Sequence, residues 1–273
     1  MATDKKIVFI TGGNTGLGFE TVKALAASTS AYEIIIGCRT PSKGEEAIAS
    51  LESQLPNTSS TFSVLQADLT SDSSLESAVR TLTSNFGRLD ILINNGGASF
   101  DWLLAEGKLS LREAFNASWD TNVSGTHVLT TLAVPLLLKS SDPRVLFITS
   151  GTSSLGETER FDNPTHARIN ASPEKGWPKP NAGLALTSYR SAKTGLNMLA
   201  REWHRILLKD GVKVWAISPG FLATGLGGAG AERLKKMGAK DPSEGGKVVK
   251  AVVEGERDQD VGKVVRADGI QPW

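Results

Sequence analysis

Short apolar runs alternate along the chain with longer segments in which apolar residues recur every three or four positions. A continuous apolar run predicts a parallel strand buried on both faces, and the longer spacing predicts an amphipathic helix. Strands are expected at residues 6–11, 33–37, 61–66, 89–93, 144–149, 212–217 and 261–266. Helices are expected at residues 19–27, 42–54, 71–86, 110–138, 183–200 and 244–254. Such alternation predicts an α/β fold built on a parallel sheet.

Two segments lack this periodicity. Residues 151–183 are rich in Gly, Pro, Asn and Ser, and connections of such length are usually functional, so they predict a substrate loop. Residues 221–240 predict a second substrate loop, whose glycine-rich part, 225–238, is expected to order over a ligand. The length suits a single domain over residues 1–273.

Composition excludes several classes of function. Thirty basic residues against 29 acidic ones give a formal charge of +1, which favours neither a nucleic-acid nor a membrane-surface partner. Cys38 is the single cysteine, and no Cys and His cluster has the spacing of a metal site. The sequence shows no signal-peptide pattern and no apolar run of about 18 residues, so we expect a cytoplasmic protein.

A glycine-rich turn follows the first predicted strand and precedes a predicted helix. This order places backbone N–H groups and a helix amino end where they bind a pyrophosphate. The alternative is a glycine turn that binds nothing. The spacing is Gly-x-x-x-Gly-x-Gly, and the candidate cofactor-binding residues are Gly12, Asn14, Thr15, Gly16, Leu17 and Gly18.

The end of the second predicted strand indicates which dinucleotide is bound. A Rossmann-like fold reads the adenosine ribose there, and an acidic residue would bind a free 2′-hydroxyl. The chain instead has Cys38 and Arg39, with Lys43 close behind. Because a guanidinium pairs a phosphate bidentately, NADP(H) is favoured over NAD. The alternative is that Arg39 is a solvated loop residue.

Further polar residues follow later strands, at the sheet edge where ligands bind in such folds. Adenine and ribose contacts are expected there from Asp68, Leu69, Asn95, Gly96 and Gly97. The alternatives are that Asp68 caps the next helix and that the asparagines shape a turn.

Three other features carry candidate chemistry. Asn122 lies inside a predicted helix, where Asn is unfavourable unless it is exposed or specifically bonded. Ser150 ends the fifth predicted strand. Tyr189 and Lys193 stand four residues apart and therefore share one helical face, although such pairs also occur on solvated helices.

Taken in order, these residues resemble the classical members of the short-chain dehydrogenase/reductase family over essentially the whole chain. The resemblance rests on Thr11-Gly12-x-x-x-Gly16-x-Gly18, Asp68, Asn94-Asn95-Gly96-Gly97, Asn122, Ser150, Tyr189-x-x-x-Lys193 and Pro219-Gly220. It implies a Rossmann-like, doubly wound parallel sheet of about seven strands with helices on both faces. The family usually has Ala where this chain has Gly96, a change that leaves the backbone role intact.

The resemblance also implies a catalytic tetrad. Tyr189 would give its proton to a carbonyl oxygen as hydride arrives at the carbon. Lys193, together with the positive charge of the oxidised nicotinamide, would lower the pKa of that phenol, and Lys193 would also bind the nicotinamide ribose. Ser150 would donate a hydrogen bond to the substrate oxygen, and Asn122 would hold a water that links Lys193 to solvent.

By the same resemblance, the segment after the sixth strand contacts the nicotinamide carboxamide and the phosphate side of the cofactor. The residues concerned are Pro219, Gly220, Leu222 and Thr224.

One departure concerns the connection between Ser150 and Tyr189, which spans 189 − 150 = 39 positions. This length resembles the monomeric carbonyl reductases. An insertion at this place is expected to cover the surface through which the common tetramers of the family associate. We therefore expect a monomer, with a dimer or tetramer as the alternative.

The sequence favours NADPH-dependent reduction of a ketone or aldehyde to an alcohol. Two alternatives remain, an NAD-dependent alcohol dehydrogenase and a non-catalytic protein that senses NADP(H). The substrate itself is not specified. Phe100, Trp102, Trp177 and Phe221 suit either an apolar or aromatic substrate or ordinary packing.

Overall fold

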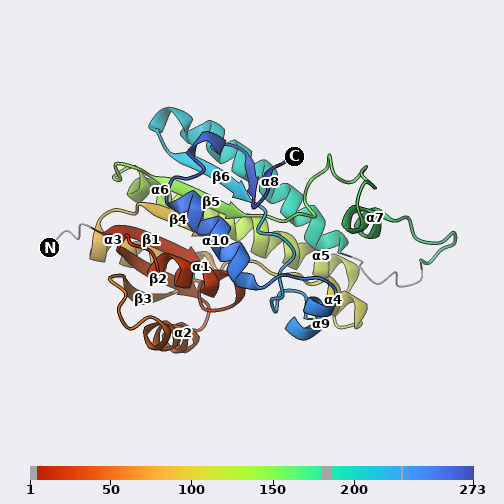
Figure 1. Ribbon diagram of the computed structural model, residues 1–273, viewed down its shortest axis with the longest axis horizontal. Coiled ribbons are helices and arrows are strands. Elements are labelled where there is room, and N and C mark those ends of the chain that lie inside the picture. Colours follow the sequence, from red (N-terminus) through yellow and green to blue (C-terminus); the bar gives the residue numbers. More distant parts are fainter. Residues whose placement is uncertain (1–4, 180–185, 229) are drawn as a thin grey trace.

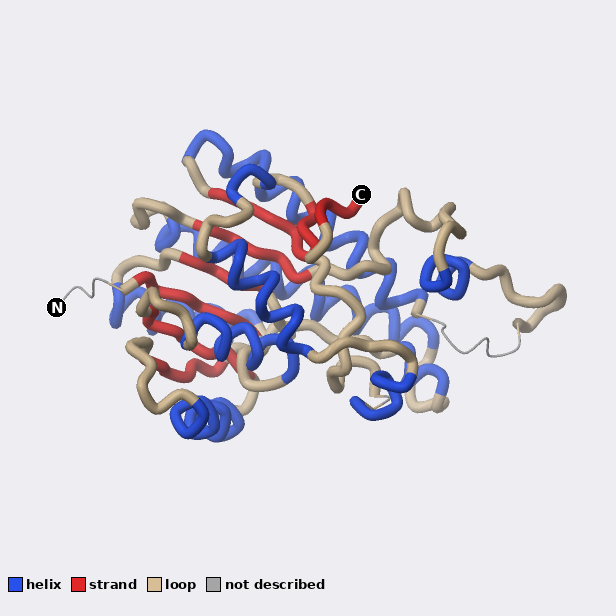
Figure 2. The backbone as a smooth tube through the Cα atoms, in the orientation of Figure 1, coloured by secondary structure: helices blue, strands red, loops and turns tan. Residues whose placement is uncertain are grey.

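Eight strands form one sheet in the order β3-β2-β1-β4-β5-β6-β7-β8 (Figures 1 and 2). The computed structural model describes residues 5–179, 186–228 and 230–273. Residues 180–183 of the first predicted loop, the first three residues of the helix expected at 183–200, and position 229 therefore lie outside the described residues. The strands are β1 (Lys6–Thr11), β2 (Tyr32–Cys38), β3 (Thr61–Gln66), β4 (Ile91–Asn94), β5 (Arg144–Ile148), β6 (Lys213–Ile217), β7 (Val264–Arg266) and β8 (Gly269–Gln271).

The predicted parallel sheet is confirmed. Strands β1 to β7 pair in parallel, and β8 adds an antiparallel strand at the β7 edge. Along β1, Ile7 and Phe9 belong to one hydrophobic cluster, while Val8 and Ile10 belong to the other. Because successive side chains point to opposite faces, this apolar run buries itself against two helical layers.

The helices form a layer on each face. Across one face lie α1 (Gly16–Ala26), α2 (Pro41–Gln54) and α10 (Pro242–Val253), and Figure 1 shows α1 beside α10. The opposite face carries α3 (Asp72–Phe86), α6 (Gly125–Leu137) and α8 (Thr187–Leu207), with α5 (Leu111–Trp119) packed against α8. The eight strands of the described residues all belong to this one sheet. The single domain over residues 1–273 stays a prediction.

Short elements account for most differences from the predicted pattern. The helix expected at residues 110–138 is divided into α5 and α6 by a π-helical turn, Asp120–Ser124. Three short helices were not predicted, α4 (Asp101–Ala105), α7 (Pro164–Asn170) and α9 (Ala231–Lys236), and neither was β8. The last two helices lie within the predicted loops. Elements of three to seven residues are too short to show a hydrophobic period.

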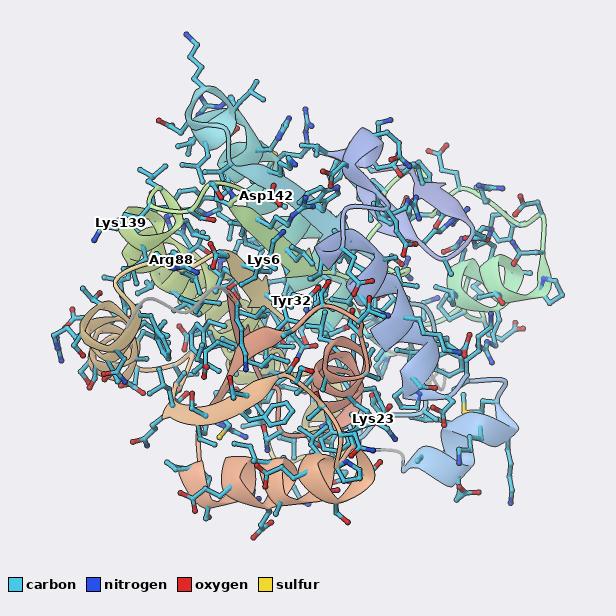
Figure 3. The ribbon with its side chains drawn as sticks, turned by 60° about the vertical axis from the view of Figure 1, so that its left-hand side comes forward. Lys6, Lys23, Tyr32, Arg88, Lys139 and Asp142 are labelled. Carbon is cyan, nitrogen blue, oxygen red and sulfur yellow. The ribbon has the colours of Figure 1, made fainter. Side chains whose placement is uncertain are left out.

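A charged cluster fastens the amino ends of three strands, at the edge opposite the motifs. The Arg144 guanidinium is buried and bonds both Asp142 and Asp258. Lys213 Nζ lies 2.9 Å from Asp142 Oδ1 and 2.7 Å from Asp258 Oδ2, and Lys6 Nζ lies 3.0 Å from Asp142 Oδ2. Lysine and arginine hydrogen bonds hold the pKa of Asp142 well below its ordinary value, although partial burial opposes them. Figure 3 labels Lys6 and Asp142 in this cluster.

We predict that Asp142→Asn removes an acid-sensitive part of the stability. The folded-state pKa of Asp142 lies below the unfolded one, so its contribution is present above about pH 4 and is lost as the pH falls further. At pH 7 the variant should lose about 2 kcal/mol of unfolding free energy, and this difference should shrink at pH 3. Denaturant unfolding at both pH values measures it. Glu52→Gln, at an exposed position of α2, is the control, and parallel acid profiles of wild type and Asp142→Asn would contradict the assignment.

Candidate functional site

The glycine turn between β1 and α1 is too tight for side chains. Gly12 and Gly16 have φ values of +64° and +55°, which favour glycine. A Cβ on Gly18 would lie 2.1 Å from the Gly12 carbonyl oxygen. This close approach brings the amino end of α1 directly under the turn, an arrangement that can bind a pyrophosphate.

Asn95 fastens β4 to this turn. Its Nδ2 donates to the Thr11 carbonyl at 2.8 Å and to the Gly12 carbonyl at 3.3 Å. Thr11 Oγ1 in turn accepts from the backbone N–H groups of Asn95 and Gly96, at 3.1 and 2.8 Å. The Asn95 side chain is therefore committed to the shape of the turn, and the sequence motif alone did not distinguish this role from a contact with adenine or ribose.

Asp68 and Leu69 lie at the same edge. Asp68 Oδ1 accepts from the N–H and the hydroxyl of Thr70, at 3.0 and 2.8 Å. Ser71, and not Asp68, caps α3, since its hydroxyl accepts from Ser74 N–H at 3.3 Å. The Leu69 carbonyl lies so close to Gly125 that a Cβ there would be 1.8 Å away. Glycine at the start of α6 thus lets this segment approach the glycine turn.

Arg39 and Lys43 are both exposed where β2 leads into α2. Lys43 lines a cavity of about 390 Å³ together with Asn14, Thr15 and residues of α1 and α2. The cavity therefore joins the glycine turn to the predicted phosphate-reading position. Its lining also includes Glu46, so a carboxylate stands in the cavity together with the Lys43 cation.

The segment after β6 closes the other side of the glycine turn. Gly220 has a φ of +98°. Thr224 lies beside Gly16, with its Cβ 3.5 Å from where a Gly16 side chain would begin. Leu222 is buried against Gly245 of α10. The structure thus brings the predicted nicotinamide-side residues against the predicted pyrophosphate-binding turn.

The four predicted catalytic residues converge at this edge. Ser150 lies close enough to the Tyr189 phenol to lower its pKa, while the Ser150 hydroxyl pairs with Thr152 Oγ1 at 3.0 Å and accepts from Thr152 N–H at 3.1 Å. Lys193 Nζ lies 5.8 Å from the Tyr189 ring centroid and donates to the Ile148 carbonyl at 2.8 Å. Asn122 Oδ1 and Lys193 Nζ both lie close to Gly97. A Cβ added to Gly97 would be 2.6 Å from the first atom and 3.2 Å from the second.

Burial shifts the two titrating groups in opposite directions. It raises the pKa of Tyr189 to about 12, although the hydrogen bond from Ser150 opposes the shift. It lowers the pKa of Lys193 to about 8. The lowering of the Tyr189 pKa by Lys193 together with the oxidised nicotinamide stays a prediction. Desolvation disfavours the charged form of each group, the phenolate of Tyr189 and the ammonium of Lys193.

Asn122 owes its place to the π-helical turn. Its side-chain amide donates to the Ser118 carbonyl at 2.7 Å and the Ala98 carbonyl at 2.8 Å, and its oxygen accepts from Ala98 N–H at 3.2 Å. In an α-helix the Ser118 carbonyl would be bonded by the backbone of the residue four positions on. The π-helical turn changes that pairing, and the fully buried Asn122 side chain satisfies the carbonyl instead.

The described part of the insertion, residues 151–179, is anchored from two sides. On α8, Arg190 donates to the carbonyls of Thr152 and Ile169 at 3.2 and 3.3 Å. From β8 and the residues after it, Gln271 Nε2 donates to the Ser150 carbonyl at 3.1 Å, and the Trp273 carbonyl accepts from Gly156 N–H at 2.8 Å. No sequence pattern predicted a role for Gln271 or Trp273, because both act through long-range backbone contacts.

Loop aromatics surround the same edge, and Figure 1 shows α4, α7 and α9 gathered beyond it. The Arg168 guanidinium of α7 lies 5.7 Å from the Phe221 ring centroid, which links the two predicted loops. Trp102 lies against the backbone of Gly228, and Lys108 is 5.8 Å from its ring centroid. Trp177 is 89% exposed.

The insertion leaves one apolar surface uncovered. Leu111, Phe115 and Trp119 of α5 and Met198 of α8 are all exposed. The insertion does not cover these four side chains, although such coverage was the reason for expecting a monomer. The monomer therefore stays a prediction. Among the described residues, no helix has the length and apolar character to cross a membrane, and no three His, Cys, Asp or Glu residues are grouped as metal ligands.

We predict that Gly18→Ala destabilises the protein and abolishes dinucleotide binding, because the new methyl group would displace the Gly12 carbonyl. Overpacking of this kind costs about 1–3 kcal/mol. Thermal unfolding and fluorescence titration with NADPH measure the two effects. Gly227→Ala is the matched control, since no atom lies within 4 Å of the added Cβ. A Gly18→Ala protein with wild-type affinity would show that the turn does not hold the cofactor.

Comparisons with known proteins agree with this geometry. The family model described as short chain dehydrogenase matches residues 6–160. The short-chain dehydrogenase/reductase tropE of Talaromyces stipitatus is 45% identical over 272 residues, which are 99% of each protein. The short-chain dehydrogenase/reductase eupG of a Phoma species is 47% identical over 281 residues, covering 100% of this chain and 99% of that one.

A similar solved structure is the NADPH-bound carbonyl reductase from chicken fatty liver. It has a TM-score of 0.76 at 21% identity and covers 99% of this chain and 100% of its own. At that identity the likeness concerns the fold. The family match, the two close relatives and the ordered motifs together show that this chain is a member of the short-chain dehydrogenase/reductase family and an oxidoreductase.

Proposed function

We propose that this protein is an NADPH-dependent reductase that converts a ketone or aldehyde to an alcohol. The observation that carries the proposal is the buried Tyr189 phenol, which lies close to Ser150 and Lys193 at the sheet edge that also holds the glycine turn. Burial raises the pKa of this phenol above its ordinary value, so Tyr189 holds its proton at neutral pH.

The chain's own residues divide the work at the carbonyl group. When bound, the nicotinamide cofactor supplies the hydride to the carbonyl carbon. Tyr189 donates its phenolic proton to the carbonyl oxygen. Ser150 donates a hydrogen bond to the same oxygen and stabilises the negative charge that develops there.

Lys193 and Asn122 support the proton transfer. Because its pKa is about 8, the Lys193 amine both holds and releases a proton near neutral pH. It is fixed by its bond to the Ile148 carbonyl and lies beside Tyr189. We infer that a water held near Asn122 connects Lys193 to solvent, since Asn122 and Lys193 border the same point next to Gly97.

The cofactor preference rests on the charge where β2 ends. Arg39 and Lys43 are exposed there, and Lys43 lines the cavity formed with Asn14 and Thr15. A 2′-phosphate would pair with these cations, whereas NAD gives them no partner. The alternative is an NAD-dependent alcohol dehydrogenase. A comparison of the affinities for NADPH and NADH distinguishes the two.

A non-catalytic NADP(H) sensor is the alternative from another class of function. Such a protein would require only the cofactor-binding residues. Here Asn122, Ser150, Tyr189 and Lys193 also converge, and this convergence supports an enzyme. Tight NADPH binding without turnover of any carbonyl in a broad panel would favour the sensor.

We predict that Tyr189→Phe lowers the rate of NADPH-dependent carbonyl reduction by about 10²- to 10⁴-fold, because the proton donor is removed. NADPH binding should stay within about twofold of wild type, since the ring remains. Loss of NADPH absorbance with a carbonyl panel measures the rate. Tyr32→Phe is the matched control, because the protein has two tyrosines and Tyr32 is buried against Glu254, away from the motifs. A Tyr189→Phe enzyme with full activity would refute the proposed chemistry.

We predict that Arg39→Ala weakens NADPH binding by about 10- to 100-fold and leaves NADH binding unchanged, because only the 2′-phosphate loses a charged partner. Titrations with both cofactors measure the two affinities. The control is Arg80→Ala, at an exposed position of α3. Equal losses for both cofactors would mean that Arg39 does not read the phosphate.

A further inference from the structure

Helix α8 begins without a cap from its own segment. The residue before its first turn, Leu186, makes no side-chain capping bond. The carboxylate of Asp101, the first residue of α4, caps the helix instead. Its Oδ1 accepts from Ser188 N–H at 2.9 Å, and its Oδ2 accepts from Tyr189 N–H at 3.0 Å. The second of these bonds is made to the backbone of the candidate proton donor itself.

The environment of Asp101 makes these bonds strong. Asp101 is 5% exposed. A carboxylate at a helix amino end satisfies N–H groups that lack a partner within the helix and interacts favourably with the helix dipole. Bonds to an ionised acceptor are also stronger than neutral ones. Ser118 Oγ of α5 donates to Ser188 Oγ at 3.0 Å and fixes the same turn from a second direction.

The position of this turn determines where the Tyr189 hydroxyl lies. Tyr189 is the third residue of α8, so movement of the first turn carries the phenol with it. In the proposed reaction the phenol and the Ser150 hydroxyl bond the same substrate oxygen, and Ser150 follows a different element, β5. Misplacement by about 1 Å can lower the rate of a reaction about 100-fold.

The same short helix also reaches the substrate-loop region. Trp102, next to Asp101, contacts the backbone at Gly228 so closely that a Cβ there would lie 2.9 Å from Trp102 Cδ2. Helix α4 therefore touches the catalytic helix through one residue and the loop at 221–240 through the next.

We propose that Asp101 is a positioning residue, which holds the first turn of α8 so that the Tyr189 phenol is aligned with Ser150 and the substrate oxygen. The proposal rests on the proposed carbonyl reduction. It adds a carboxylate from outside the tetrad that acts through the backbone of the proton donor.

The test compares Asp101→Asn and Asp101→Ala with wild type. The amide keeps one accepting oxygen and turns an N–H₂ group toward the other backbone N–H, whereas alanine removes both acceptors. We expect kcat to fall about 10-fold in Asp101→Asn and about 100-fold in Asp101→Ala, with KM and Kd for NADPH within about twofold of wild type. Hydrogen exchange should show faster exchange at Ser188 and Tyr189 in both variants, with the centre of α8 unchanged.

Asp90→Asn is the matched control. Asp90 is 6% exposed and accepts from Ile7 N–H at 2.8 Å, but it lies at the opposite edge of the sheet. Its substitution should leave kcat unchanged in the folded protein, which thermal unfolding verifies. Faster exchange at Ser188 and Tyr189 with a wild-type kcat would overturn the proposal, and so would unchanged exchange at both amides. Inactivity of wild type toward all carbonyls would instead contradict the proposed function, while the exchange result would still report whether Asp101 holds the turn.

Discussion

The candidate site depends on the close approach of the Gly12 carbonyl to Gly18, where an added Cβ would lie 2.1 Å from the oxygen. This contact sets how α1 leaves β1. Asn95 then bonds the same carbonyl region, which fixes β4 to the turn. Gly125 lets the Leu69 segment approach in the same way, and Thr224 lies against Gly16. The edge that holds the cofactor-binding and catalytic candidates is therefore built from backbone approaches that side chains would prevent.

Burial then determines the protonation states at this edge. Tyr189 and Lys193 are both buried, and burial disfavours whichever form is charged. The phenol therefore keeps its proton, while the amine loses its proton more readily than usual. Burial therefore leaves a protonated phenol beside an amine that can take up and release a proton.

Local patterns predicted the glycine turn and its neighbouring elements, whereas they predicted neither the short helices nor the long-range contacts around the two predicted substrate loops. The apolar run at β1 and the glycine turn lie within a few residues of each other, so their relationship could be read from the sequence. The tetrad also followed, because its spacing matches a family pattern. Asp101 and Gln271 carried no such signal, since each acts on a backbone group about 90 or more positions away. The burial of Tyr189, which raises its pKa, could not be predicted because burial depends on the completed fold.

This difference between the glycine turn and the predicted substrate loops suggests which residues of the site can be substituted while its chemistry is kept. The glycine turn and Asn95 depend on one another through contacts that tolerate no added atoms. The insertion, in contrast, is held mainly by bonds to backbone carbonyls, from Arg190 on one side and Gln271 on the other. A backbone carbonyl accepts such a bond whatever side chain its residue carries. Side chains of the insertion can therefore be substituted while these anchors keep the backbone at Ser150 and the insertion in place.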